Sequence, residues 1–464
     1  MATSGPARQW PDWTHPGGCQ RGPNPCSGGG SLSHTAPQSA MMVFMSPTSP
    51  RRPATSADAG NRRTEVRDVA ANLFLRNGFA ATTMNDIAAA AGIHPGSLYH
   101  HFASKEEIAV ELVGAFNDDL TALIAETKRL TGIGTPERRF RDLAARLAEF
   151  GMRHAAAVRL RGYQPPSTTT ERLATVLDFD EHELVAVWRD AAEAAVASAD
   201  PPADAGLLRF AVAHLVIDSG TTYSPGTDVR PVTALLCDLF LHGLAVDAPS
   251  DAELDASSPM KVAIETVAGW SSSTSDETDD RASILAAARS EFARRGYAAT
   301  TIRGISQAAE VRMATMYRRV SSKEAMLTEI LGTYSQILNS GVAAVIETEG
   351  SEVERLDAVM YLLTNATRRF AEETSIVKFG WNGREPGAGP FQTYSEQTQG
   401  RLSLLEGVLA RGLDQGAIRP LGASSELALL VRRILWLPYG DFEDSDSART
   451  HAFLRRSLLR PTLT

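Results

Sequence analysis

Polar residues with anion-binding chemistry recur in two short passages of this sequence. The first passage, from Ala80 to Glu107, reads "AATTMNDIAAAAGIHPGSLYHHFASKEE", and the second, from Ala298, reads "AATTIRGISQAAEVRMATMYRRVSSKEA". Their hydroxyl groups and tyrosines can donate hydrogen bonds to phosphate oxygens. Lys105, at the expected start of a helix, adds a cation beside backbone N–H donors. Both passages therefore carry the ingredients of a phosphate-binding surface.

The two passages belong to a longer repeat with constant spacing. Gly78 recurs as Gly296 and Thr83 as Thr301, a shift of 218 residues in both cases. The shift holds without a gap over about fifty positions, which is too long for a solenoid unit and indicates a duplicated domain.

Each repeated passage follows a stretch in which apolar residues recur at helical spacing. In the first copy the apolar residues of this helix are followed by a glycine that stops it, the set being Val66, Val69, Ala70, Leu73, Phe74 and Gly78. A short helix follows, for which Thr83 is the expected N-cap and Asp86, three residues on, can complete a capping box. Gly92 then predicts a tight turn.

A second short helix, "HPGSLYHH", follows the turn, and a longer helix begins after Ser104, where we expect Glu107 to complete a capping box. Two short helices around a glycine turn, braced by a third, make a helix-turn-helix, whose second helix enters the major groove of DNA. Small residues on that helix allow a close approach to base edges. Because Leu98 faces inward, the outer and N-terminal face consists of His94, Pro95, Gly96, Ser97, Tyr99 and His100.

The two copies resemble the TetR/AcrR (tetracycline-repressor-like) family of bacterial transcriptional regulators. The resemblance rests on "LFLRNGFAATTMNDIAAAAGIHPGSLYHHFASKEEI" and "EFARRGYAATTIRGISQAAEVRMATMYRRVSSKEAM". It implies an all-α protein in which a three-helix DNA-binding domain precedes a larger helical domain for effector binding and dimerisation. It also implies phosphate contacts by Thr82, Thr83, Tyr99 and Lys105 in the first copy, and by Thr300, Thr301, Tyr317 and Lys323 in the second.

The recognition helices of the two copies differ in charge. The second copy reads "RMATMYRR", and its outer face comprises Arg312, Met313, Ala314, Thr315, Tyr317, Arg318 and Arg319. An arginine can bind O6 and N7 of guanine bidentately, which no residue of "HPGSLYHH" can do at neutral pH. We expect the second copy to bind more tightly and the two copies to read different half-sites.

The second copy also departs from the family pattern at two positions. Glu310 replaces the turn glycine, which costs about 1 kcal/mol if the backbone there needs positive φ. Val320 stands where the family has a buried phenylalanine, which leaves the core less filled. A second domain that no longer binds DNA therefore remains an alternative.

The repeat and the loop-rich stretches predict six segments. They are a disordered Gly/Pro/Ser-rich tail (1–61), a first helix-turn-helix domain (62–113, motif about 84–103), a first helical effector and dimerisation domain (114–248), a linker (249–280), a second helix-turn-helix domain (281–331, motif about 302–321) and a second helical domain (332–464).

Aromatic residues of the helical domains are candidates for effector pockets, although aromatic residues at helical spacing usually belong to a core. The candidates are Met152, Tyr163, Trp188 and Tyr223 in the first half, and Tyr361, Phe370, Trp381, Tyr394 and Trp436 in the second. The passage "YSPGTDVRP" with "ALLCDLFLHGL" resembles family members that sense lipid-like or acyl-thioester ligands.

Composition excludes several other classes of protein. The sequence has no apolar run long enough for a membrane span and no signal-peptide pattern, so we expect a cytoplasmic protein. Its three cysteines have no metal-ligand spacing, and it carries no P-loop, G-x-S-x-G or H-E-x-x-H motif, so we expect no metal, no cofactor and no catalytic residues. The net charge of −9 does not exclude nucleic acid, because affinity for DNA comes from locally placed cations.

The sequence thus predicts a transcriptional regulator of two fused TetR-like units that represses until an effector releases it. Its partners would be double-stranded DNA with a near-palindromic operator and a small molecule. One chain could form an internal pseudo-dimer, or two chains could form a homodimer with four DNA-binding units. The alternative from another class is a ligand-binding or interaction protein whose helix-turn-helix units no longer bind DNA.

Overall fold

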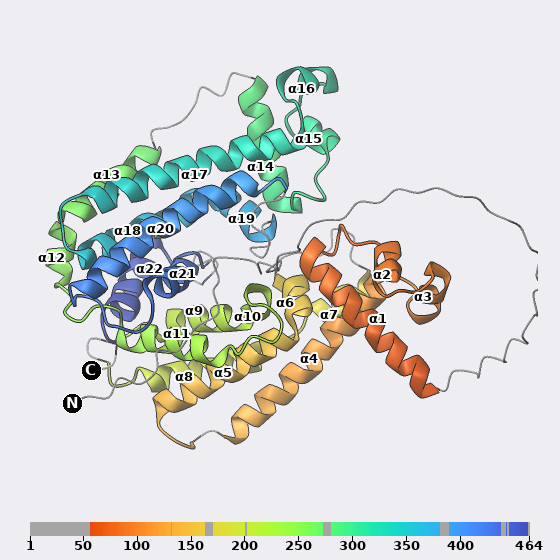
Figure 1. Cartoon of the computed structure of the whole chain (residues 1–464), viewed down its shortest axis with the longest axis horizontal. Coiled ribbons are helices and arrows are strands. Elements are labelled where there is room, and N and C mark those ends of the chain that lie inside the picture. The colour runs from red at the N-terminus through yellow and green to blue at the C-terminus, as the bar shows by residue number, and fades with distance from the viewer. Residues whose placement is uncertain are drawn as a thin grey trace, which may run out of the picture. The chain divides into compact units, whose positions relative to one another are not determined.

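The computed structural model describes residues 56–130, 132–162, 170–199, 202–271, 280–380, 389–437, 442 and 445–462 (Figure 1). Every named element within these ranges is helical, and the extended backbone there includes one isolated antiparallel bridge, between Ala245 and Ile418. The predicted all-α fold is confirmed.

The first half of the described chain contains the first helix-turn-helix and a helical body. Its helices are α1 (Ser56–Asn77), α2 (Met84–Ala90), α3 (Pro95–His101), α4 (Lys105–Arg129), α5 (Pro136–Arg153), α6 (Ala155–Gly162), α7 (Glu171–Leu177), α8 (His182–Ala195), α9 (Ala205–Ile217), α10 (Ser219–Thr222) and α11 (Arg230–His242).

The second half repeats this order. Its helices are α14 (Asp280–Arg295), α15 (Ile302–Ala308), α16 (Met313–Arg319), α17 (Lys323–Glu347), α18 (Glu352–Arg369), α19 (Ala371–Gly380), α20 (Gln392–Asp414), α21 (Ser424–Leu435), α22 (Ser447–Leu454) and the π-helix η2 (Arg455–Leu459). A shift of 218 residues relates α2 to α15, α3 to α16 and α4 to α17 end for end. The duplication therefore extends from sequence to structure.

Side-chain caps explain why the short helices begin where they do. Thr83 accepts a hydrogen bond from the Asp86 N–H, and the Asp86 carboxylate accepts from the Thr83 N–H, so the predicted capping box is present. At the start of α4, Ser104 caps the helix as expected. The Glu107 carboxylate, however, accepts from the Ala103 N–H at 2.7 Å rather than from Ser104.

Helix α1 begins at Ser56, whereas the sequence placed the end of the tail at residue 61. The added turns are polar, and Asn61 and Arg62 both bond to Glu65 along the helix. A polar extension has no apolar stripe, so periodicity could not reveal it. The rest of the predicted tail, residues 1–55, lies outside the described residues.

The predicted linker is also shorter than expected. Helices α12 (Asp251–Ala256) and α13 (Ser258–Ser271) occupy most of it, and α13 packs against α17 and α18. Met260 and Ala263 supply buried contacts for this packing. Residues 251–271 therefore belong to the second helical body, and the polar stretch 272–279 lies outside the described residues.

The last helices of the two halves contact each other along a surface that we call the seam, formed by residues 204–246, 417–437 and 445–462. Helix α11 contacts η2, and α9 contacts α21. The Leu244 N–H donates to the Leu458 carbonyl at 2.8 Å, and the Thr462 N–H donates to the Leu241 carbonyl at 2.9 Å. The rings of Phe240 and Phe453 stack across the seam, 5.9 Å apart.

The seam joins helices that hold corresponding places in the two halves, α9 with α21 and α11 with η2. Leu244 and Thr462 each donate an N–H to the other half. Arg433 on α21 donates to the carbonyl of Leu215 on α9 at 3.1 Å. Contact between corresponding helices is the pattern of a two-fold interface.

One glycine of the seam provides a test of this packing. Gly243 has φ of 66° and ψ of 175°, and a Cβ atom there would lie 2.4 Å from the backbone of Arg460. We expect Gly243→Ala to lower the free energy of unfolding by at least about 3 kcal/mol, because backbone strain adds to a clash between backbones. Chemical denaturation measures this change.

The matched control is Gly226→Ala. Gly226 also has positive φ, 86°, but a Cβ atom would meet nothing within 4 Å. This substitution should cost only about 1 kcal/mol. Equal losses in the two variants would show that the seam is not packed in solution.

Candidate nucleic-acid interface

The first helix-turn-helix has the predicted core. Helix α2 contacts α1 and α3, and Ile87, Leu98 and Phe102 are each almost completely buried. Gly92 adopts φ of 64° at the turn, which favours glycine. Figure 1 shows α2 and α3 following α1 and leading into the long helix α4.

The outer face of α3 is exposed as the sequence predicts. His94, Gly96, Ser97 and His100 are exposed, and Pro95 is half-buried. Tyr99 is 55% exposed although tyrosine usually buries its ring. An exposed tyrosine beside small residues suits contact with a surface that presents phosphate oxygens.

The outer face of α16 is similar in shape and more basic. Arg312, Ala314, Arg318 and Arg319 are exposed, and Met313 and Thr315 are half-buried. Tyr317, the counterpart of Tyr99, is 62% exposed, whereas Met316 is fully buried. Arg319 lies 3.6 Å from Asp280, so its charge is partly offset.

The four threonines with implied phosphate contacts have two different structural roles. Thr83 and Thr301 are exposed N-caps of α2 and α15. Thr82 and Thr300 are buried, and each hydroxyl donates to the carbonyl of the preceding turn glycine, Gly78 at 2.8 Å or Gly296 at 2.9 Å. The phosphate contacts implied for all four threonines stay a prediction.

Lys105 and Lys323 hold the loop between the first two helices. The Lys105 Nζ donates to the carbonyls of Phe79, Ala80 and Thr82 at 2.8, 3.3 and 2.9 Å. The Lys323 Nζ donates to the carbonyls of Tyr297 and Thr300 at 2.8 and 3.0 Å. Burial lowers the pKa of both lysines. Sequence reasoning missed this bracing role, and their phosphate contacts stay a prediction.

Glu310 occupies the strained turn position that the sequence predicts. Its φ is 56°, and it is the one non-glycine residue with positive φ among those described. We expect Glu310→Gly to raise the free energy of unfolding by about 1 kcal/mol, because glycine adopts this conformation without a Cβ clash. Urea denaturation measures the gain.

The equivalent turn of the first copy provides the control. Gly92→Ala should cost about 1 kcal/mol, because Gly92 has φ of 64° and open space around its Cβ position. Opposite signs for the two substitutions are expected. A loss of stability in Glu310→Gly would contradict the strain argument.

Val320 leaves a hollow where the first copy is filled. Phe102, its counterpart, is 1% exposed, and the guanidinium of Arg63 lies 4.0 Å from its ring centroid. Beside Val320 there is a hollow of about 350 Å³, lined in part by Arg281, the counterpart of Arg63. This hollow is open at the surface, beside the position where valine replaces phenylalanine, and the less filled core stays a prediction.

Comparisons with known proteins agree with this geometry. A family model described as "Bacterial regulatory proteins, tetR family" matches residues 66–112 and again residues 284–330. These two matches contain α2–α3 and α15–α16. The chain belongs to the TetR family. This is a family of regulatory proteins and not of enzymes.

Relatives of the TetR family resemble part of the chain. The transcriptional repressor KstR2 of Rhodococcus jostii (strain RHA1) is 55% identical over 73 residues, which are 16% of this chain and 35% of that protein. The transcriptional regulator TcmR of Streptomyces glaucescens is 40% identical over 55 residues, 12% of this chain and 24% of that protein. The chain thus matches about a third or less of the length of these two relatives.

One solved structure, of the probable transcriptional regulatory protein RHA5900, is 31% identical to this TetR-family chain. The comparison covers 38% of this chain and 95% of that one, with a TM-score of 0.33.

The structure distributes the candidate effector residues of this TetR-family chain over several places. Trp188 is buried edge-on to Phe140, 5.6 Å away, and Met152 is half-buried in the same body. The hydroxyl of Tyr223 accepts from Arg433 across the seam at 2.7 Å, and Tyr361 lies against His451. Tyr163 and Trp381 lie outside the described residues.

Three of the candidates in the second TetR-type unit come together around a residue that sequence reasoning missed. Phe370, Tyr394 and Trp436 lie 5.5, 6.3 and 6.4 Å from the ring of Tyr334, centroid to centroid. Tyr334 is on α17 and 1% exposed. Its place in an apolar helical stripe made it indistinguishable from a core residue.

The described residues of this TetR-family chain contain no group of three or more His, Cys, Asp or Glu that could hold a metal ion. No described helix is long and apolar enough to cross a membrane. Burial raises the pKa of the Cys237 thiol to about 12, so the thiol is protonated and unreactive at neutral pH.

Proposed function

We propose that this protein is a transcriptional repressor that binds a near-palindromic operator with both helix-turn-helix units of one chain. The observation that supports the proposal most is the seam, on which the corresponding helices α9 and α21 of the two halves meet. A two-fold arrangement of recognition helices suits a near-palindrome. The chain would act as an internal pseudo-dimer in the cytoplasm.

The two recognition helices would read different half-sites. On α16, Arg312 and Arg318 are exposed and can bind guanine O6 and N7 bidentately. On α3, His94, Gly96 and Ser97 let the backbone approach base edges without a permanent charge. Tyr99 and Tyr317 would contact phosphates at both sites, which fixes the register rather than the base preference.

Release would follow from effector binding in a helical body. In the second half, Arg289 on α14 pairs with Glu372 and Glu373 on α19 at 3.0 and 3.2 Å. In the first half, α1 contacts α6 at the equivalent place. A ligand that moves α6 or α19 would therefore move a recognition helix and change the separation that the operator requires.

We propose a lipid-like or acyl-thioester effector for the first half. Its interior around Trp188 is apolar, with Phe140, Leu143, Leu207 and Leu208 buried. The Trp188 indole Nε1 has no hydrogen-bond partner within the described residues. An apolar ligand with one acceptor oxygen, such as an acyl carbonyl, would suit this interior.

The experiment combines a mass measurement with gel-shift titration. The full chain is titrated with duplex DNA from its own upstream region, and the mass of the free protein and of the complex is measured by light scattering. One chain per operator supports the pseudo-dimer. Two chains per operator would favour the homodimer with four DNA-binding units.

A ligand-binding protein with a decayed second helix-turn-helix is the rival function. Glu310 and Val320 favour it, because both make the second unit less stable. It predicts weak DNA binding that is insensitive to salt, whereas binding through phosphates weakens steeply as salt rises. Titrations at two salt concentrations therefore distinguish the two functions.

A further inference from the structure

The interior of the second helical body is polar around a pair of tyrosines. Tyr334 on α17 and Tyr394 on α20 are 1% and 3% exposed, and their rings are parallel with centroids 6.3 Å apart. The Tyr334 hydroxyl lies 3.3 Å from the Thr374 hydroxyl. Burial raises the pKa of both tyrosines, so both hydroxyls are protonated and can donate.

A positive charge lies next to this pair. The Arg401 guanidinium is 5.7 Å from the Tyr394 ring centroid. It donates to the Asn339 side chain at 2.7 Å, the Thr398 hydroxyl at 2.9 Å and the Ser335 carbonyl at 3.4 Å. All three acceptors are neutral, so these contacts orient the arginine without neutralising it.

Two more arginines add to the charge from the neighbouring helix α21. Burial lowers the pKa of Arg432, and the positive charges of Arg401 and Arg433 lower it further, which places both guanidinium groups within electrostatic reach of Arg432. Arg433 donates to neutral oxygens, the Tyr223 hydroxyl and the Leu215 carbonyl. The neighbouring carboxylate of Glu373 already pairs with Arg289.

Two buried polar atoms in the same region lack a partner within the described residues. They are Oγ of Ser335, a residue with 0% exposure, and Oε1 of Gln397. Ser335 and Gln397 lie in sequence between the Tyr334–Tyr394 contact and the Asn339–Arg401 contact on the same two helices. Buried polar groups without hydrogen-bond partners are rare and costly in free energy. A buried hydroxyl without such a partner therefore points to a ligand that would supply one.

The first half lacks the polar residues of this arrangement on the matching helix. Helix α4 matches α17 end for end, and the counterparts of Tyr334 and Ser335 there are Phe116 and Asn117. The tyrosine and the buried serine therefore belong to the second half alone.

We propose that the second helical body binds an organic anion between α17, α20 and α21. Its carboxylate or phosphate oxygens would accept from Arg401 and Arg432, and its body would lie against Tyr334, Tyr394 and Trp436. The Ser335 hydroxyl would complete the site. Charge-assisted hydrogen bonds from guanidinium groups are the strong form of such recognition. This inference rests on the proposed function, because it names the chemical class of one effector.

The test measures ligand binding without DNA. The full chain is titrated by calorimetry with 2-naphthoate, 2-naphthyl phosphate and the neutral 2-naphthamide, which share one aromatic body. We expect at least one anion to bind at least about tenfold more tightly than the amide, because only an anion pairs with the arginines. The tighter of the two anions identifies the head group.

Variants locate the site. Arg432→Gln should weaken anion binding by at least about tenfold, and Arg432→Lys should retain part of it because the charge remains. Ser335→Ala should weaken the anion while leaving the melting temperature of the free protein unchanged or higher, since it removes a hydroxyl without a partner. The control is Arg189→Gln, an exposed arginine of the first half, which should change nothing.

Several outcomes would overturn the inference. They are no binding of either anion, equal binding of the amide, and anion binding unaffected by Arg432→Gln and Ser335→Ala. If Arg432→Gln does not fold, the anion affinities of Ser335→Ala and Arg432→Lys still test the inference. If the chain binds an anion but does not bind operator DNA, the proposed repressor function is contradicted and the inferred anion site remains supported.

Discussion

A chain with both Tyr99→Ala and Arg312→Ala binds its operator roughly two to four orders of magnitude more weakly than the parent chain. Removing the Arg312 side chain from the outer face of the second recognition helix should cost about 1–3 kcal/mol of DNA-binding free energy, because a contact with a base edge is lost. Tyr99 is 55% exposed on the first recognition helix. Removing its side chain should cost about 1.5–3 kcal/mol of DNA-binding free energy, because a hydrogen bond to a charged phosphate is lost. Because the two sites are on separate units, the losses should add.

Gel-shift titration of each single variant and of the double variant measures these losses. Arg312→Ala should reduce discrimination at one base pair, whereas Tyr99→Ala should weaken all duplexes alike. Arg189→Ala, on the exposed side of the first helical body, is the control and should bind normally. Unchanged binding by the double variant would rule out both recognition helices as the DNA contact.

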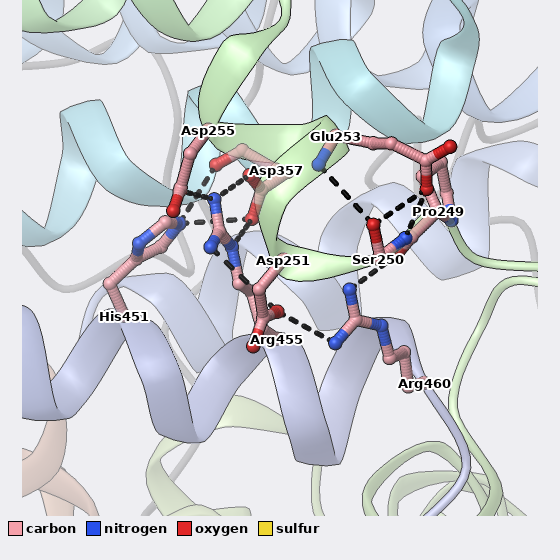
Figure 2. Close-up of polar contacts among 9 residues, drawn as sticks. All are labelled: Pro249, Ser250, Asp251, Glu253, Asp255, Asp357, His451, Arg455 and Arg460. Atoms are coloured by element: carbon pink, nitrogen blue, oxygen red, sulfur yellow. Dashed lines mark hydrogen bonds and ion pairs between the residues drawn. The ribbon is translucent and has the colours of Figure 1, made fainter.

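Asp357→Asn is expected to lower the free energy of unfolding by about 3–5 kcal/mol. Asp357 on α18 is fully buried, and its carboxylate accepts from Nε and Nη2 of Arg455 at 2.8 and 2.7 Å and from Nε2 of His451 at 2.9 Å. Figure 2 shows Arg455 between this carboxylate and the acids of α12. Removing the charge leaves a buried guanidinium without its main counter-ion.

Asp255→Asn is the matched control. Asp255 also pairs with Arg455, at 2.7 Å, but its side chain is 66% exposed. An exposed partner is screened by water, so this variant should lose less than about 1 kcal/mol. Similar losses for the two variants would mean that burial does not decide the strength of this network.

The same carboxylate makes stability depend on pH. Burial alone would raise the pKa of Asp357, but the hydrogen bonds from His451 and Arg455 outweigh it and hold the pKa below the ordinary 3.8. A carboxyl group with a lowered pKa stabilises the fold above its ordinary pKa and loses that contribution as pH falls. The stability difference between the parent and Asp357→Asn should therefore shrink from about pH 5 towards pH 2.

Local features of the helix-turn-helix units could be read from the sequence. The caps at Thr83 and Ser104, the turn at Gly92 and the strained turn at Glu310 all depend on residues within four positions of one another. The exposed tyrosines followed from helical periodicity, because Leu98 and Met316 fix which face is buried. Short-range chemistry decides such features, so they do not need a tertiary structure.

Long-range packing decided the rest. Periodicity could not reveal that Lys105 reaches back 26 residues to the Phe79 carbonyl, or that α13 packs on the second body. Nor could it distinguish Tyr334 in a polar interior from a tyrosine in an ordinary core, because both occupy the buried stripe of a helix.

By itself, the sequence determined that the chain is all-helical, duplicated at a shift of 218 residues, and equipped with two recognition helices of unequal charge. Only the tertiary structure decided that Arg433 meets Leu215 across the seam and that Arg401 and Arg432 lie near Tyr394. The physical reason is that helix starts and faces depend on neighbouring residues, whereas a seam or an interior depends on side chains brought together from distant helices.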